Sequence, residues 1–308
     1  MHGWTWRRGF VEAVDADTAP FLTQLRELLR AAPLLREATL RRFGRPRASE
    51  LLAVHPGIRR LRALTVDARP TDPDTPRPQV AAALLAPTLA GLEALTLLDV
   101  HLGDAGLRIL AAATHLTALR ALSLGDCRAG VAGLTALAAA PLFRSLTALS
   151  LSTRALDAEA LAPLFAHGEA LTELRVTHLG DDGLAALAAS PALARLEVLA
   201  FPDDRDVTAR GIAALAASPH LRLRELDARA SRVGDAGLEA LAASPGAEQL
   251  TRFVFGLEPD HGVTARGLLA LLRSPHLRRL EDLPGWLVWP PLTDAERAEV
   301  DAWRAARS

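Results

Sequence analysis

The chain has 308 residues, with 35 basic and 36 acidic side chains and a formal net charge of −1 at pH 7. Half of the residues are hydrophobic, so a chain of this length can bury a large core and is not a disordered tail. The balanced charge excludes the overall positive field that non-specific nucleic-acid binding needs, and we predict no nucleic-acid partner.

The missing residue types indicate a high-GC genome. The sequence has no Lys, Asn or Tyr, so all 35 basic residues are Arg.

The one cysteine, Cys127, excludes an intrachain disulfide and a multi-thiolate zinc site. No apolar run of about 18 residues occurs, and the first residues lack the apolar run of a signal peptide. We therefore predict a cytoplasmic protein without membrane contact.

Residues 1–60 are predicted to form a helical N-terminal cap. The apolar residues within 10–14, and then those within 21–29, have the spacing of two amphipathic helices. Residues 37–40 predict an edge strand about one repeat before the first full copy described below. Such a cap closes a sheet edge that would otherwise invite aggregation.

From Leu61 onward, a segment of the form LxxLxL recurs through the chain. The copies begin at positions 61, 92, 119, 146, 171, 196, 223 and 250, and a degraded ninth copy begins at 277. Their starts are separated by 31, 27, 27, 25, 25, 27, 27 and 27 residues. Residues 61–283 are therefore predicted to hold eight or nine copies of about 27 residues each.

Each copy predicts one strand followed by one helix. The apolar alternation in LxxLxL is typical of a strand with one buried face, and runs such as GLEALAAS are helical until a proline stops them. So short a unit cannot bury its own apolar stripe, and neighbouring copies must stack. The predicted fold is an α/β solenoid or horseshoe, with a parallel sheet on the concave face and helices on the convex face. Residues 284–308 are predicted to be the C-terminal cap, with a helix beginning near Thr293.

A Gly-Asp-x-Gly turn precedes the helix of several copies, as in Gly234, Asp235 and Gly237. A phosphate-binding loop is expected once, followed by Lys and Ser or Thr, whereas this turn recurs and Thr takes its place in other copies. We interpret Asp235 as the N-cap of its own helix, Gly237 as a site of close backbone approach, and Ser244-Pro245 as the end of that helix.

The strand motif, helix motif and period together resemble the leucine-rich repeats of the ribonuclease-inhibitor type. Members of that family usually carry Asn or Cys at the ninth repeat position, where the side chain satisfies backbone groups; here only Cys127 matches. That column reads Val100, Cys127, Arg154, Leu179, Asp204, Ser231 and Glu258. The N-terminus, with Trp6 and the run from Arg8 to Val11, is similar to the repeat-companion domain of bacterial leucine-rich-repeat proteins.

We find no motif for catalysis, a cofactor or a metal. No GxSxG elbow, dinucleotide loop or HExxH spacing occurs, and the recurring histidines at 115, 220 and 276 are interpreted as turn residues. We therefore predict a protein that is not an enzyme and has no cofactor.

The predicted binding surface is the concave face from Leu171 onward, where charges of both signs gather. The candidate partner-binding residues are Glu173, Arg175, His178, Glu225, Asp227, Arg229, Arg252, Arg279 and Glu281. The alternative is that adjacent strands only pair their opposite charges.

Two other features are candidates for contact with a partner. All five tryptophans, Trp4, Trp6, Trp286, Trp289 and Trp303, lie in the caps, where they either seal the core or, at 286 and 289, form a docking patch. Residues 69–78, RPTDPDTPRP, are either a tolerated insertion or a recognition loop.

The resemblance to leucine-rich-repeat proteins implies a protein-protein interaction module, and we expect it to bind an unidentified protein on the concave sheet as a monomer. Two alternatives remain. The chain regulates a small GTPase or another enzyme, or it is a structural domain that assembles through its caps.

Overall fold

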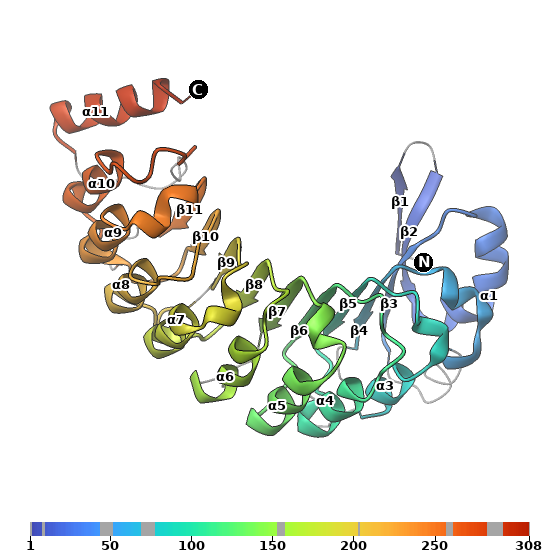
Figure 1. Ribbon diagram of the computed structural model, residues 1–308. Helices are drawn as coiled ribbons and strands as arrows, with labels where there is room; N and C mark the ends of the chain where they lie inside the picture. Colours follow the sequence, from blue (N-terminus) through green and yellow to red (C-terminus); the bar gives the residue numbers. More distant parts are fainter. Residues whose placement is uncertain are drawn as a thin grey trace. The chain divides into compact units, whose positions relative to one another are not determined.

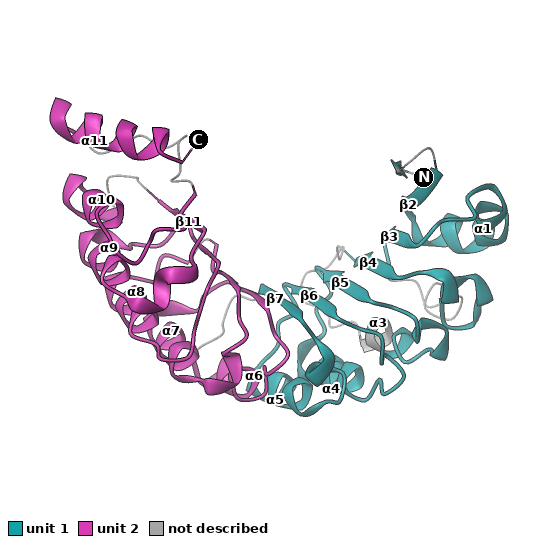
Figure 2. Ribbon diagram, turned by 45° about the horizontal axis from the view of Figure 1, so that its top comes forward, with its two compact units in different colours: residues 1–155 teal, residues 156–308 magenta. Residues whose placement is uncertain are grey.

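The computed structural model describes residues 2–7, 10–43, 52–68, 78–152, 158–202, 204–256, 261–281 and 292–307. The chain divides within the repeat region into two compact units, Met1–Ala155 and Leu156–Ser308 (Figure 2). Residues 69–77, which make up nearly all of the proline-rich segment, lie outside the described residues, as do Trp286 and Trp289.

Unit 1 consists of a sheet and the helices that connect its strands (Figure 1). Its elements are β1 (Gly3–Arg7), β2 (Phe10–Asp17), α1 (Thr18–Ala31), β3 (Glu37–Arg41), η1 (Pro56–Arg60), β4 (Ala63–Asp67), α3 (Pro78–Ala83), η2 (Pro87–Leu89), β5 (Ala94–Leu98), α4 (Gly103–Ala111), β6 (Ala121–Gly125), α5 (Val131–Ala139), η3 (Phe143–Ser145) and β7 (Ala148–Ser152). The strands β1 to β7 lie in chain order; β1 and β2 are antiparallel, and every later pair is parallel.

Unit 2 repeats the same arrangement. Its elements are α6 (Ala158–Ala166), β8 (Glu173–Val176), α7 (Gly180–Ala189), η4 (Pro191–Leu193), β9 (Val198–Ala200), α8 (Ala209–Ala216), β10 (Glu225–Ala228), α9 (Gly234–Ala242), η5 (Pro245–Gln249), β11 (Arg252–Phe255), α10 (Ala265–Leu272) and α11 (Asp294–Ala305). Strands β8 to β11 are parallel and in chain order. In each unit the helices lie against one side of the sheet (Figure 1), and we call the other side the open sheet face.

Leucines at the same position of successive strands form buried columns, and these columns explain why the strands align. Leu95, Leu122 and Leu149 are register partners on neighbouring strands, and each is about 1% exposed. Removing one leucine side chain from water contributes about 1.5–3 kcal/mol. A one-residue slip would turn the whole column toward solvent, so the LxxLxL spacing fixes the register.

The N-terminal cap differs from the prediction in its first element. The apolar residues at 10–14 belong to strand β2, not to a helix, and only the second predicted helix, α1, forms. In β2, Val14 and Ala16 are buried while their neighbours are partly exposed, the period-two pattern of a strand. The predicted strand at 37–40 is confirmed as β3, but it is not the edge, because β2 pairs with it and β1 pairs with β2.

The aspartate of the Gly-Asp-x-Gly turn does not cap its own helix. The N-cap residue of α9 is Val233, and it makes no side-chain cap bond. Asp235 instead accepts hydrogen bonds from the backbone N–H of Thr264 (2.7 Å) and of Gly267 (3.1 Å), at the start of the next helix, α10. The prediction of a capping role is correct, but the helix it named is wrong.

The same inter-helix contact occurs at two other pairs of helices. Asp104 on α4 accepts from the N–H of Gly130 (2.7 Å) and Gly133 (3.0 Å) at α5. Asp181 on α7 accepts from Thr208 (2.8 Å) and Gly211 (2.9 Å) at α8. The carboxylate therefore pairs α4 with α5, α7 with α8 and α9 with α10.

Glycine at the third position of the receiving turn makes this approach possible. A Cβ on Gly267 would lie 2.5 Å from an Asp235 oxygen and 2.8 Å from its Cα, and a Cβ on Gly133 would lie 2.6 Å from an Asp104 oxygen. For Gly237 itself, the prediction of close backbone approach also holds, because a Cβ there would lie 3.3 Å from the Cα of Ala209 on α8 and 3.0 Å from the Val233 side chain. The glycine that opens each turn has positive φ: 58° at Gly103, 62° at Gly180 and 59° at Gly234.

The ends of several helices lie where the sequence predicts them. Thr208 and Thr264 cap their own helices by accepting from the N–H two residues on, and Thr293 begins α11 with a capping box. Helix α9 ends before Pro245, and the Ser244 hydroxyl donates to the Ala216 carbonyl of the preceding helix at 2.5 Å. The described part of the degraded ninth copy, residues 277–281, forms no strand, although Leu277 and Leu280 are buried.

Candidate functional site

The predicted charged residues lie on or beside the open sheet face of unit 2. Glu173 and Arg175 are on β8, Glu225 and Asp227 are on β10, and Arg252 is on β11. His178 follows β8 with a positive φ of 58°, and Arg279 and Glu281 are exposed in the segment after α10. The structure therefore places five of the nine residues on strands of unit 2 and the other four in segments that follow a strand or helix of that unit.

Most of these charges are paired with one another. Arg175 Nε lies 2.6 Å from Glu173 Oε1, and Arg229 holds both carboxylate oxygens of Asp227, at 3.0 and 2.6 Å. These two pairs join residues two apart on one strand or its end. Pairing between adjacent strands, the alternative interpretation, occurs where Arg252 lies 3.5 Å from Glu225.

The ion pairs on this face leave its arginine side chains accessible to a partner. The Arg175, Arg229 and Arg252 side chains keep 46%, 53% and 66% of their surface exposed. Exposed pairs contribute about 0–1 kcal/mol, so a partner can rearrange them at low cost.

A second cluster lies at the edge of the same sheet where its strands begin. We call it the arginine pocket; it is a hollow of about 380 Å³ lined by Thr172, Ala194, Arg195, Leu196, Glu197, Arg222, Arg224, Gln249 and Arg279. Thr172, Glu197 and Arg224 each immediately precede a strand, β8, β9 and β10 respectively. Of this lining, only Arg279 belongs to the predicted partner-binding residues.

Backbone hydrogen bonds hold the pocket's turns side by side. The Glu197 N–H donates to the Thr172 carbonyl (2.9 Å), and the Arg224 N–H donates to the Glu197 carbonyl (2.7 Å). The Thr251 N–H continues the series to the Arg224 carbonyl (2.8 Å). Residues about 27 positions apart in sequence are thus direct neighbours, which brings their side chains to one place.

The lining of the pocket is strongly basic. Four guanidinium groups face one carboxylate, Glu197, which lies 3.7 Å from Arg224. Arg279 donates to the neutral Gln249 amide oxygen (2.7 Å), and Arg222 donates to the Leu221 carbonyl (2.7 Å). Neither partner carries charge, so among the described residues of the lining most of the positive charge has no carboxylate partner.

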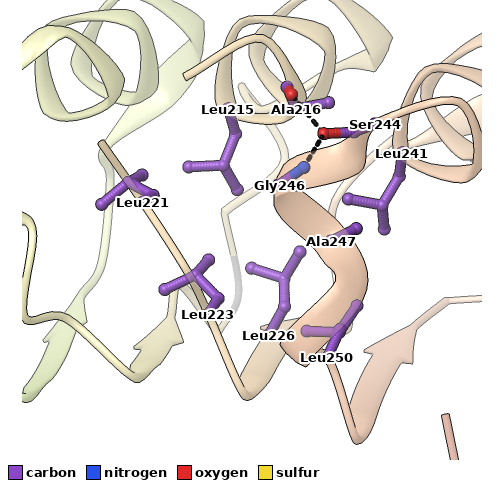
Figure 3. A pocket seen from close by; sticks show the side chains of 10 residues that line it. All are labelled: Leu215, Ala216, Leu221, Leu223, Leu226, Leu241, Ser244, Gly246, Ala247 and Leu250. Atoms are coloured by element: carbon purple, nitrogen blue, oxygen red, sulfur yellow. Dashed lines mark hydrogen bonds between the residues drawn. The ribbon is translucent and has the colours of Figure 1, made fainter. Parts of the chain in front are cut away.

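A smaller apolar cavity lies between α8, α9 and β10 (Figure 3). Its volume is about 20 Å³, which is room for about one water molecule. Leucine side chains line most of it, and the one hydroxyl, of Ser244, is already bonded to the Ala216 carbonyl and the Gly246 N–H. The cavity is a packing gap and is too small for a ligand.

The cysteine and histidines do not form a reactive group. Burial raises the pKa of the Cys127 thiol, which disfavours the thiolate that a nucleophile needs. Within the ranges that the structure describes, no group of three His, Cys, Asp or Glu side chains is arranged to hold a metal ion.

Of the ninth-position residues, Asp204 makes bonds of the kind that the resemblance implies for Asn. It is fully buried and accepts hydrogen bonds from the N–H of Leu179 and, at 3.0 Å, of Gly180. Val100, Cys127, Leu179 and Ser231 are also buried in this column, whereas Arg154 and Glu258 lie outside the described residues.

The tryptophans of the N-terminal cap do not seal the core. Trp4 and Trp6 on β1 are 40% and 66% exposed, and Phe10 on β2 is 53% exposed. The sealing prediction is wrong for these two tryptophans, because β1 extends the sheet beyond the part that α1 covers. In α11, Trp303 is half-buried and the Arg307 guanidinium lies 4.2 Å from its ring centre.

No protein-family model and no curated protein matches the sequence. Among solved structures, an internalin from Listeria monocytogenes is similar at 17% identity over 83% of this chain and 69% of that chain, with a TM-score of 0.46. TLR13 in complex with ssRNA13 is similar at 15% identity over 86% of this chain and 37% of that chain (TM-score 0.49). Rad7 in its complex with Elc1 from yeast is similar at 15% identity over 90% of this chain and 88% of that chain (TM-score 0.40).

The chain has the leucine-rich-repeat fold. The period of about 27 residues, the parallel strands in chain order and the helices on one side of each sheet together establish it. Among the described residues, no helix has the length and apolar character needed to cross a membrane.

Proposed function

We propose that this chain is a non-catalytic interaction module that binds a protein partner on the open sheet face of unit 2. The observation that carries the proposal is where the charged side chains lie. At the third position of LxxLxL, unit 2 has Glu173, Val198, Glu225 and Arg252, whereas unit 1 has Ala63, Ala94, Ala121 and Ala148. Exposed Arg side chains of this kind are common anchors in protein interfaces.

The proposal includes the finer features of the family resemblance. The repeats, over residues 61–283, are of the ribonuclease-inhibitor type; residues 1–60 are the companion domain of a bacterial protein, and residues 284–308 are the C-terminal cap. The single, buried Cys127 is consistent with a reducing cytoplasm. The balanced net charge of −1 favours a protein partner over a nucleic acid.

A capture experiment with matched variants tests the site. The first variant replaces Arg175, Asp227, Arg229 and Arg252 with Ala. The control replaces Thr65, Thr96, Ser123 and Ser150 with Ala, which changes the same face of unit 1. We expect a partner that wild type and control retain, and that the unit 2 variant loses. Equal recovery by all three proteins would exclude the unit 2 face.

A photo-crosslinking residue separates direct contact from indirect loss. Placed at Val198 in unit 2, it is expected to crosslink the partner, whereas at Thr96 in unit 1 it is not. Crosslinking of the same partner at Thr96 alone would move the site to the other unit.

The structure also favours a second candidate, assembly through the N-terminal cap. Strand β1 has β2 as its one neighbour among the described strands, and it carries the exposed Trp4 and Trp6. An exposed edge strand with apolar side chains is a template for pairing with another chain. Sedimentation over a range of concentrations tests this: assembly is expected for wild type and not for Trp6→Glu, and a monomer at every concentration would contradict it.

A further inference from the structure

We infer that the arginine pocket is a binding site for a phosphate monoester. It is separate from the residues replaced in the capture experiment above. Three observations point to this ligand: the excess of positive charge in the lining, the donors that its arginines present, and the size of the hollow.

The lining of the pocket has an excess of positive charge. Arg195, Arg222, Arg224 and Arg279 contribute four positive charges, and Glu197 contributes one negative charge, so the lining carries a net charge of +3. Gathering like charges is destabilising unless an anion compensates them. A phosphate monoester carries about −1.5 to −2 charge near neutral pH, which compensates this excess better than one carboxylate.

Arginines of the pocket also keep N–H donors that a phosphate can use. Arg195 has no hydrogen-bond or ion-pair partner in the described chain, and the interactions of Arg222 and Arg279 with neutral oxygens leave further N–H groups on each guanidinium. A guanidinium presents its donors as a rigid planar fork that binds two phosphate oxygens at once. Because adjacent strands are about 4.8 Å apart, arginines from successive turns can reach the same phosphate.

The size of the hollow indicates what carries the phosphate. About 380 Å³ is within the range of small-molecule sites and exceeds what a bare phosphate ion fills. The lining has no aromatic side chain for stacking a nucleobase, but Thr172 and Gln249 can bond hydroxyl or amide groups. The ligand is therefore a phosphate on a small polar carrier, such as a sugar phosphate or a phosphorylated serine.

The repeats themselves provide an internal comparison. The residue immediately before the first leucine of a copy is Arg195 in one copy of unit 2. In unit 1 it is Arg60 in one copy and Gly91, Ala118 and Ser145 in the other three. The corresponding residue before Leu223 is Arg222. Three of the four unit 1 copies have no arginine at this position, so the fold does not require one there.

Isothermal titration calorimetry with phosphoserine, glucose 6-phosphate and inorganic phosphate tests the site at constant ionic strength. Serine, glucose and citrate are the matched controls for the carrier and for charge alone. We expect both esters to bind more tightly than inorganic phosphate, and the neutral compounds not to bind. Preference for one ester identifies the carrier as amino acid or sugar; binding of citrate alone, or of nothing, would overturn the inference.

Variants assign the binding to the pocket. Arg195→Gln and Arg222→Gln are each expected to weaken ester binding at least about tenfold, because each loses a charge-assisted hydrogen bond. Arg108→Gln, an exposed change on α4, is expected to leave it unchanged. Circular dichroism checks that the variants fold, and unchanged affinity in both folded pocket variants would overturn the assignment. Because these variants keep Arg175, Asp227, Arg229 and Arg252, the capture experiment can fail or succeed independently.

Discussion

The two units share one construction and differ on their exposed surfaces. Both have parallel strands whose fourth and sixth LxxLxL positions are buried, as at Leu122 and Leu124 in unit 1 and at Leu226 and Ala228 in unit 2. At the third and fifth positions unit 1 has Ala, Thr and Ser, whereas unit 2 has mostly Glu, Asp and Arg. The repeat constrains the buried positions, which leaves the residues of the open sheet face free to differ between the units.

The largest expected effect comes from the buried columns that both units share. Leu122→Ala and Leu226→Ala each remove a side chain that is about 1% exposed, and each should lower the free energy of unfolding by about 2–5 kcal/mol. Urea denaturation of each variant measures this. A much smaller cost in one unit would show that the cores are not equivalent.

The inter-helix aspartates should show a graded difference between the units. Asp235 accepts from two backbone N–H groups and, at 2.6 Å, from the Thr264 hydroxyl, whereas Asp104 accepts from two backbone N–H groups and from no hydroxyl among the described residues. We expect Asp235→Ala to cost about 2 kcal/mol and Asp104→Ala about 1 kcal/mol. Urea denaturation, with hydrogen exchange at the starts of α10 and α5, is the measurement. If hydrogen exchange changes at the start of α9 instead, Asp235 caps its own helix and not the next one.

Acid should weaken the helix pairs of unit 2. Burial by itself raises the pKa of Asp181 and Asp235, but hydrogen bonds from Thr208 or Thr264 and from backbone N–H groups outweigh it, so each pKa is lowered below its ordinary value of 3.8. This stabilisation is present above the unfolded pKa and is lost as pH falls through the folded pKa.

The expected result is a smaller free energy of unfolding at about pH 3 than at about pH 6, with less of this loss in an Asp181→Asn, Asp235→Asn double variant. Asn keeps one acceptor oxygen but does not titrate in this range. If the double variant loses as much stability as wild type over the same interval, these carboxylates do not supply the pH dependence.

The smallest expected effect is on the open sheet face. Arg252→Ala in unit 2 and Ala121→Arg in unit 1 should each change the free energy of unfolding by no more than about 0.5 kcal/mol, because both positions are outside the core. Thermal denaturation checks this. A large loss on adding Arg at 121 would mean that the bland face of unit 1 is constrained by packing.

Patterns within one copy predicted most of the local structure correctly, and the errors lie in the N-terminal hairpin and in contacts that cross between copies. The strands from Ala63 to Phe255, the helix starts at Thr208 and Thr264, and the helix end before Pro245 follow from patterns within one copy. The β1–β2 hairpin was missed because the short apolar stretch at 10–14 fits both helical and strand periods.

The two candidate sites differ in the same respect: one follows from the pattern within a strand, and the other depends on contacts between copies. The charges on the open sheet face were found because alternation within a strand assigns each residue to a face. The arginine pocket was missed, although a signal existed: Arg195, Arg222 and Arg224 flank the first leucine of two consecutive copies.

The sequence by itself determined the repeat, the leucine columns and the residues that face away from them, because these depend on spacing along a single strand or helix. Only the tertiary structure decided that Asp235 caps the next helix and that four arginines line one hollow. Both depend on how neighbouring copies stack, which places residues about 27 apart in sequence within hydrogen-bonding reach.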